Sequence, residues 1–258
     1  MHHIKPYLKN LERLRAGTYR DSKSGLFLDR NERSVPYDSK IIEALFHHLK
    51  NVNFGLYPEL EPFYHKLSNW LGIPDNQIYV TEGVSGAIKS LVETLTIPEK
   101  HNIVFPYPTF AMYPVYCEMF SVEPRMVGYT NSYKLDYENL IDSIDKNTAI
   151  VFLPNPNMPI EGTLSIEEIA NVAKKCLKHK VMLAIDEVYY PYGGPTAIEL
   201  VNNYDNLFVM QSFSKAFGLA GIRVGYVVSN EKNIDYVSKT RTGYETNSFS
   251  MEIASFFI

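Results

Sequence analysis

Cysteine is scarce in this sequence, and long apolar runs are missing from it. Only Cys117 and Cys176 occur among the 258 residues, each within an apolar helical pattern, which indicates buried free thiols rather than a disulfide or metal-binding pair. No apolar run approaches the roughly 20 residues that cross a bilayer. The N-terminal stretch MHHIKPYLKNLERLR lacks the apolar core of a signal peptide. We therefore expect a cytoplasmic protein without a membrane partner.

The sequence also lacks an excess of charge and any histidine pattern typical of metal sites. The formal net charge is −4 and like charges form no long block, which argues against nucleic acid as a partner. The seven histidines include no HExxH motif, and the adjacent His47 and His48 would point to different faces of a helix. We therefore predict no metal site. The remaining composition, 45% hydrophobic and 21% charged, is that of a globular protein.

Short apolar runs alternate along the chain with amphipathic stretches, and this alternation predicts strands and helices in βαβα order. The predicted strands span 77–80, 102–105, 148–153, 181–186, 206–211 and 223–228. The predicted helices span 38–51, 59–71, 85–95, 109–120, 165–178 and 231–241. Ser165 and Glu168 form a capping-box pattern at the start of the fifth helix.

Most predicted strands are apolar throughout, which implies that both faces of the sheet are buried. We therefore predict an α/β fold, a three-layer αβα sandwich with a mainly parallel sheet. Because ligands of such sheets bind at the carboxyl ends of the strands, the residues that follow each strand are the candidate site.

The residues after the first three predicted strands are weak evidence when each is taken alone. Gly83 permits a tight turn before Val84 and Ser85, whose N–H groups at a helix start could hold an anion, but an ordinary loop has the same pattern. Pro108 is expected to start a helix with Phe110 in its first turn. The next loop, PNPNMPIEG, is rich in turn-forming residues.

The residues after the later strands carry stronger chemical signals. Asp186 ends an apolar run, and a carboxylate buried there requires a partner, for which we expect a cation. In SFSKAFGLAGIRVGY, Lys215 stands among apolar residues as imine-forming lysines do, and Arg223 can grip a phosphate, with the Ser212 hydroxyl beside it. With Phe110 as an aromatic plate, these groups fit pyridoxal 5′-phosphate, whose ring nitrogen would be the cation at Asp186.

The motifs LDRNE, DEVY and SFSKAFGLAGIRVGY occur in the order found in the fold-type I pyridoxal-phosphate enzymes. Within them the chain resembles the class I/II aminotransferases and is most similar to the histidinol-phosphate aminotransferases, over nearly its whole length. The resemblance implies an aspartate aminotransferase-like large domain and an enzyme that moves an amino group between an amino acid and a keto compound, which could be phosphorylated. Biosynthesis is the expected context.

The same resemblance implies a role for each matching residue. Lys215 would form the Schiff base and move the substrate's proton, Asp186 would pair with the ring nitrogen, and Tyr189 would bind the phenolic oxygen. Phe110 would stack on the ring, and Asn31 and Glu32 match a segment near the substrate. The expected phosphate ligands are Val84, Ser85, Ser212, Ser214 and Arg223. Tyr57, in GLYPEL, would reach the phosphate of a neighbouring subunit, which implies a homodimer.

Two departures from the family pattern affect the expected substrate. Met158 replaces the asparagine that usually contacts both the phenolic oxygen and the substrate carboxylate, and a thioether cannot donate that hydrogen bond. Glu245 stands where an asparagine is usual. Met158 is therefore a candidate substrate residue that makes a decarboxylase of a phosphorylated amino acid a credible alternative. A protein that binds the cofactor without turnover is the third hypothesis.

The third departure is length, because the chain stops within SMEIASFFI, before the region that carries the family's carboxylate-binding arginine. A helix ending in exposed Phe256, Phe257 and Ile258 would leave an apolar face unburied, so we expect a missing C-terminal small domain. The predicted divisions are an N-terminal arm and substrate-side segment at 1–36, a large cofactor-binding domain at 37–241 and the start of a small domain at 242–258. The candidates for general substrate contact are Arg20, Arg30 and Arg241.

Overall fold

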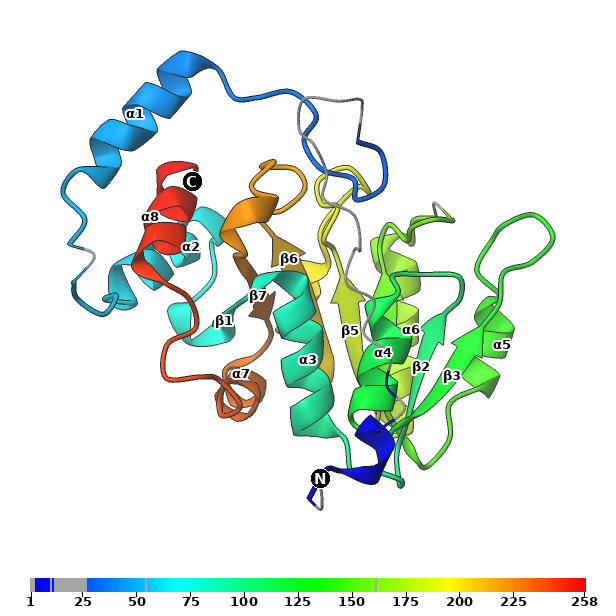
Figure 1. The fold of residues 1–258 in the computed structure, drawn as a ribbon. Coiled ribbons are helices and arrows are strands. Elements are labelled where there is room, and N and C mark those ends of the chain that lie inside the picture. Colours follow the sequence, from blue (N-terminus) through cyan, green and yellow to red (C-terminus); the bar gives the residue numbers. More distant parts are fainter. Residues whose placement is uncertain (1–2, 10, 12–26, 54, 161) are drawn as a thin grey trace.

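A mixed β-sheet forms the centre of the protein (Figure 1). The structure, a computed structural model, describes residues 3–9, 11, 27–53, 55–160 and 162–258. Within these residues the sheet has seven strands in the order β1-β7-β6-β5-β4-β2-β3. The strands are β1 (Ile78–Thr81), β2 (Asn102–Pro106), β3 (Glu123–Val127), β4 (Thr148–Pro154), β5 (Met182–Asp186), β6 (Leu207–Ser212) and β7 (Gly225–Val228). Strand β7 runs antiparallel to β1 and β6, and the other neighbouring pairs are parallel.

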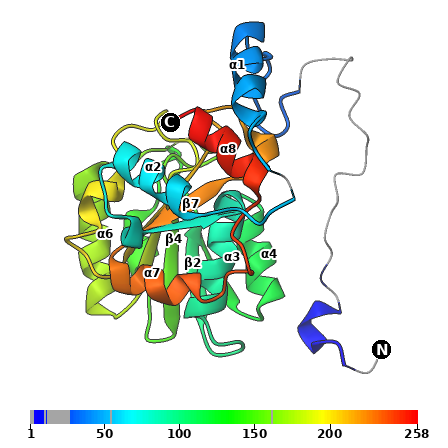
Figure 2. The same cartoon turned by 90° about the vertical axis from the view of Figure 1, so that its left-hand side faces the viewer.

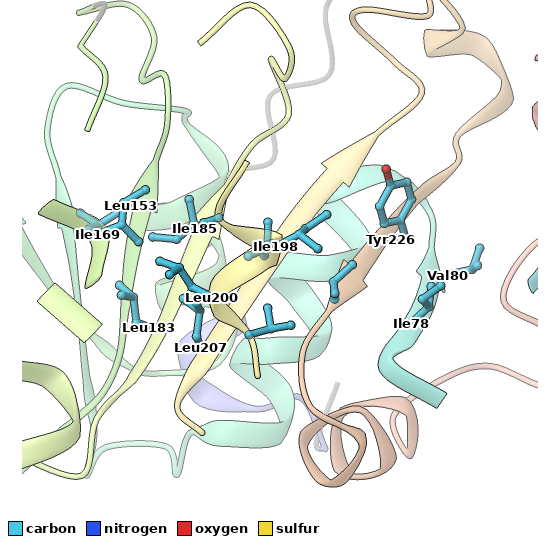
Figure 3. Close-up of a cluster of buried hydrophobic side chains, with 14 of the residues drawn as sticks. Ile78, Val80, Leu153, Ile169, Leu183, Ile185, Ile198, Leu200, Leu207 and Tyr226 are labelled. Atoms are coloured by element: carbon cyan, nitrogen blue, oxygen red, sulfur yellow. The ribbon is translucent and has the colours of Figure 1, made fainter. Parts of the chain in front are cut away.

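Successive side chains of the central strands enter two separate apolar cores, one on each face of the sheet. Leu183 and Ile185 of β5 lie in the core drawn in Figure 3, whereas Ala184 between them lies in the other. The same alternation holds along β6, where Leu207 and Phe208 occupy opposite faces. This burial of both faces explains why the strands read as continuous apolar runs.

Helices cover both faces of the sheet, which confirms the three-layer αβα sandwich (Figures 1 and 2). The helices are α1 (Ser39–Leu49), α2 (Glu61–Leu71), α3 (Gly83–Leu95), α4 (Met112–Met119), α5 (Tyr137–Asp142), α6 (Ile166–Lys178), α7 (Glu231–Ser238) and α8 (Ser248–Phe256). Buried residues of α2, α5, α6 and α8 belong to the core of Figure 3, and those of α3, α4 and α7 belong to the other core. The predicted capping box between Ser165 and Glu168 is present at the start of α6.

Three expectations about elements were wrong or incomplete. Helix α4 begins at Met112 rather than at Pro108, so Phe110 precedes the helix instead of lying in its first turn. The cause is a set of loop contacts, because the Thr109 hydroxyl donates to Asn157 Oδ1 at 2.6 Å and Asn157 Nδ2 donates to the Pro108 carbonyl at 3.0 Å. Strand β3 and helix α5 were not predicted at all.

The C-terminal aromatic residues are not left exposed, contrary to the expectation. Phe256, Phe257 and Ile258 are half-buried, and Phe257 and Ile258 pack against the core of Figure 3. The Phe257 ring lies 5.1 Å from the Tyr37 ring, and the Phe256 ring lies 5.8 Å from the imidazole of His48 in α1. Helix α1 therefore covers part of the apolar face of α8 that was expected to be exposed (Figure 2).

Both cysteines are buried free thiols, as predicted, and burial raises the pKa of Cys117 and of Cys176 to about 12. Across the described ranges, no helix is long and apolar enough to cross a membrane. The same residues contain no group of three or more histidine, cysteine, aspartate or glutamate side chains arranged to hold a metal ion.

Candidate active site

A cavity of about 680 Å³ opens beside the ends of β4, β5 and β6. The predicted site residues that line this cavity are Asn31, Val84, Ser85, Phe110, Met158, Asp186, Tyr189, Ser212, Ser214, Lys215 and Arg223. These residues come from segments spread over almost 200 positions of the chain, so the fold brings together most of the set that the sequence singled out. Of the residues predicted to bind the cofactor, Tyr57 does not line the cavity.

The Lys215 amine lies at the wall of this cavity, just beyond the end of β6. Its Nζ donates hydrogen bonds to the carbonyl of Arg30 at 2.6 Å and to that of Asn31 at 3.2 Å. Desolvation lowers the pKa of Lys215, the Glu32 carboxylate opposes the shift, and the Arg223 charge adds to it. A lysine with a lowered pKa carries more of the neutral, nucleophilic amine, which is the form that attacks carbonyl groups.

An anion cradle forms where the start of α3 meets β7. Gly83 has a left-handed backbone (φ 65°), and a Cβ there would lie 2.9 Å from the Arg223 guanidinium. Arg223 itself has φ 56° and donates to the Glu82 carbonyl at 3.2 Å, which holds the guanidinium against the first turn of α3. The N–H groups at a helix start and an arginine together favour a phosphate.

Two serines complete the cradle from the end of β6. The Ser212 hydroxyl accepts the Ser214 N–H at 3.0 Å and lies 2.9 Å from the Ser214 hydroxyl. Ser212 pairs with Gly225 of β7, which in turn touches the start of α3. Both hydroxyls therefore lie beside the helix start and can donate to the same anion.

Gly225 is expected to be intolerant of any side chain. A Cβ at this position would lie 2.7 Å from the backbone carbon of Gly83 and 2.9 Å from the nitrogen of Val84. The Gly225→Ala variant should therefore push α3 away from β7, lower the free energy of unfolding by about 1–3 kcal/mol and weaken the binding of inorganic phosphate. Urea unfolding and phosphate titration measure the two effects.

Gly243→Ala is the matched control for this variant, because a Cβ at Gly243 meets no atom within 4 Å. It should leave stability and phosphate binding nearly unchanged. A Gly225→Ala protein as stable as the parent chain would contradict the close approach of β7 and α3.

Asp186 lies at the end of β5 and is 2% exposed, with both carboxylate oxygens hydrogen-bonded. Tyr113 donates its hydroxyl proton to Oδ2 at 2.7 Å, and the Val188 N–H donates to Oδ1 at 3.0 Å. Burial raises the pKa of Asp186 to about 6, although these two hydrogen bonds act in the opposite direction. The expected partner was a cation, whereas the hydrogen-bond partners within the chain are a hydroxyl and a backbone N–H.

Tyr113 is a site residue that the sequence reading missed. It occurs in PYPTFAMY, three residues after Phe110, and was not distinguished from the aromatic residues of an ordinary helix. One signal could have identified it, because a buried aspartate requires a hydrogen-bond donor and a tyrosine hydroxyl can supply one.

Tyr189 and Asn31 form a second polar contact at the mouth of the cavity. The Asn31 side-chain amide donates to the Tyr189 hydroxyl at 2.8 Å, and Asn31 has φ 50°. The Lys215 Nζ lies 5.7 Å from the centre of the Tyr189 ring. The segment with LDRNE therefore faces the lysine and the tyrosine that follow β6 and β5.

Phe110 and Met158 supply apolar surface to the same cavity. The Phe110 ring is 44% exposed and stands edge-on to the Tyr113 ring, at 6.2 Å and 88°. Met158 lines the cavity and follows Asn157, whose side chain hydrogen-bonds to the Thr109 hydroxyl and to the Pro108 carbonyl. A thioether there offers no hydrogen-bond donor to a ligand.

The remaining predicted contacts lie in different places. Tyr57 is 77% exposed and stacks on Tyr244 at 4.6 Å, away from the cavity. Arg30 lines the cavity, whereas Arg241 pairs with Glu245 at 3.6 Å, and Arg20 lies outside the described residues. Glu245 is buried and is not among the cavity residues.

The fold and the cavity together define the large domain of the pyridoxal-phosphate-dependent transferase fold. A solved structure titled histidinol-phosphate aminotransferase from Sinorhizobium meliloti superposes on 99% of this chain and 71% of that chain, with a TM-score of 0.85 and 20% identity. The chain belongs to the aminotransferase class I and II family, whose model matches residues 26–256.

Individual relatives share this architecture. The histidinol-phosphate aminotransferase of Thermoanaerobacter pseudethanolicus is 31% identical over 88% of this chain, which spans 64% of that protein's length. A solved structure titled L-threonine-O-3-phosphate decarboxylase from Porphyromonas gingivalis has a TM-score of 0.71 at 24% identity and covers 83% of this chain and 67% of that chain. The fold therefore occurs in proteins named for different reactions.

Proposed function

We propose that the protein is a pyridoxal 5′-phosphate-dependent aminotransferase that moves an amino group between an amino acid and a keto compound. The single observation that carries this proposal is the convergence of Lys215, Asp186 and the Arg223 cradle on one cavity. Family membership and relatives named as aminotransferases support it. Because those relatives are named for histidinol phosphate, we extend the proposal to a phosphorylated keto acceptor.

The residues present fit the cofactor. Arg223, Ser212 and Ser214 line the cavity together with the start of α3, and these donors suit a phosphate. The buried Asp186 carboxylate lines the same cavity, where it can pair with a protonated ring nitrogen. When bound, pyridoxal phosphate supplies an aldehyde that condenses with amines and a ring that accepts electrons from the substrate's Cα. Here Arg223 and the two serines would hold its phosphate, and Tyr189 its phenolic oxygen.

Within that arrangement Lys215 has two tasks. Its amine would hold the cofactor through the cofactor's aldehyde, and the same amine would move a proton at the substrate's Cα. The lowered pKa of Lys215 favours both tasks, because each requires the neutral amine. Asp186 would hold the proton on the ring nitrogen, and Phe110 would stack on the ring.

Tyr57 supports a homodimer, which we propose as the working assembly. It is exposed on its own chain and lies outside its own cavity, as a residue that serves a neighbouring subunit would. The division into segments 1–36, 37–241 and 242–258 and the cytoplasmic location stay predictions from the sequence.

A decarboxylase is the second candidate, favoured by Met158. The reaction type depends on which bond at Cα stands perpendicular to the ring, and the substrate carboxylate would lack a hydrogen bond from position 158. A carboxylate that is held less firmly can take another orientation, including the one in which its own bond breaks.

The experiment loads the protein with pyridoxal phosphate and adds glutamate, or O-phosphothreonine in a parallel sample. Loss of the visible absorption band with formation of the pyridoxamine form and a keto acid is the expected result. Release of CO₂ without a keto acid would instead establish the decarboxylase. An unchanged cofactor spectrum together with no release of CO₂ over a panel of amino acids would contradict both and indicate binding without turnover.

A further inference from the structure

The hydrogen bond between Tyr113 and Asp186 joins a helix to the end of a neighbouring strand of the sheet. Tyr113 comes from α4 in one helical layer, and Asp186 comes from the end of β5 in the sheet. Both are nearly inaccessible, at 1% and 2% exposure, and the O···O distance is 2.7 Å. A buried hydroxyl that donates to a carboxylate belongs to the stronger class of hydrogen bonds.

The Tyr113 ring has little freedom to turn. Phe105 of β2 lies 5.6 Å from it and Phe152 of β4 lies 5.0 Å from it, both as ring-centre distances. Phe110 closes a third side, edge-on at 6.2 Å. The hydroxyl is consequently fixed by aromatic packing, and it fixes the carboxylate oxygen that it contacts.

The direction of the hydrogen bond is also fixed. Burial and the neighbouring Asp186 charge raise the pKa of Tyr113 well above its usual value, so the tyrosine keeps its proton and acts as the donor. The second oxygen of Asp186 receives the Val188 N–H at 3.0 Å. A side-chain donor from α4 and a backbone donor from the turn after β5 therefore determine the plane of the carboxylate.

We propose that Tyr113 is a positioning residue, which aims the Asp186 carboxylate at the ring nitrogen of the bound cofactor. This inference rests on the proposed function, since it presumes that a pyridine ring occupies the cavity. Tyr113 acts only through Asp186 and its edge contact with Phe110, and it does not itself line the cavity. Removing its hydroxyl should weaken the binding of ligands that carry the ring nitrogen and should leave the binding of ligands that lack it unchanged.

The test compares two ligands on the Tyr113→Phe variant. One is pyridoxal phosphate, and the other is its carbocyclic analogue, in which a C–H group replaces the ring nitrogen. Tyr113→Phe should weaken pyridoxal phosphate binding about tenfold, the loss typical of a hydrogen bond to a charged group, while analogue binding changes less than twofold. Equilibrium dialysis of both ligands gives the two ratios.

Tyr226→Phe is the matched control, because Tyr226 is also fully buried and also donates at 2.7 Å, but to Gln211. It should change the binding of both ligands by the same small factor. Urea unfolding of both apoproteins verifies that each variant is folded.

The outcomes separate this inference from the proposed function. If the parent chain fails to bind pyridoxal phosphate, the proposed function is wrong. If the parent chain binds it but Tyr113→Phe binds it equally well, or loses both ligands by the same factor, then Tyr113 has a structural role only and the positioning role is overturned.

Discussion

Replacing Lys215 with arginine is expected to abolish covalent attachment of pyridoxal phosphate while leaving the fold intact. Arginine keeps the positive charge and can still donate to the carbonyls of Arg30 and Asn31, but its guanidinium does not lose a proton and forms no imine. Amino transfer should fall by at least about 10²–10⁴-fold, the usual contribution of general acid–base catalysis alone.

Borohydride reduction followed by peptide mapping measures this effect directly. In the parent chain the label should appear on the peptide that contains Lys215, and in Lys215→Arg no peptide should carry it. Lys239→Ala is the control, since Lys239 is an exposed lysine that pairs with Asp235 and does not line the cavity. Label found on another lysine of the parent chain would refute the assignment of position 215.

Apolar patterning was sufficient to predict the interior of the sheet. Six strands were predicted because their side chains enter apolar cores on both faces, so nearly every residue is hydrophobic. Strand β3 was missed because it lies at the edge of the sheet and mostly faces solvent, with glutamate, proline and arginine among its five residues. Edge strands with such residues carry no apolar signal.

Helix boundaries depended on contacts that the sequence does not display. Pro108 is a common helix starter, yet the contacts of Thr109 and Asn157 delay the start of α4 to Met112. Helix α5 was missed because it has only six residues, although its N-terminal cap Asp136 was a usable signal. The contacts of Phe256 with His48 of α1 and of Phe257 with Tyr37 are likewise long-range and could not be predicted from local pattern.

The site residues were likewise predicted where the local sequence identifies them and missed where only a distant contact does. Lys215, Asp186 and Arg223 were found because each is a charged residue in an apolar setting near a strand end, and the fold places all three at one cavity. Tyr113 was missed because its importance comes only from meeting Asp186, which lies 73 positions away. The sequence shows that a buried Asp186 needs a hydrogen-bond partner, but it does not show that this partner is Tyr113.

Asp186→Asn is expected to stabilise the apoprotein at neutral pH while weakening cofactor binding. The Asp186 carboxyl titrates at about 6 in the folded chain against 3.8 as its ordinary value, so the folded state binds more protons between these two values. The free energy of unfolding therefore falls as pH rises from about 4 to 6, by about 3 kcal/mol for this group. Asparagine is uncharged over this whole pH range, so the Asp186→Asn variant does not lose this free energy of unfolding as the pH rises.

Urea unfolding of the two apoproteins at pH 4 and pH 8 tests this expectation. The stability advantage of Asp186→Asn should be largest at pH 8, at most about 3 kcal/mol because the amide loses part of the hydrogen bonding, and should vanish near pH 4. Asp145→Asn is the control, and its effect on stability at pH 8 should have the opposite sign. Burial raises the Asp145 pKa, but hydrogen bonds from Asn147, Asn102 and Arg125 outweigh it and lower the pKa to about 2, so its removal should destabilise at pH 8.

The same Asp186→Asn substitution that stabilises the apoprotein should weaken cofactor binding, and this links the pKa of Asp186 to its proposed role. A buried carboxylate with two neutral donors is a less stable arrangement than the same carboxylate beside a pyridinium, so the folded apoprotein holds an ionised group that is costly until a cation arrives. Pyridoxal phosphate should thus raise the stability of the parent chain more than that of Asp186→Asn, and most of all above pH 6. Equal stabilisation of both chains by the cofactor at pH 8 would mean that Asp186 does not meet the ring nitrogen.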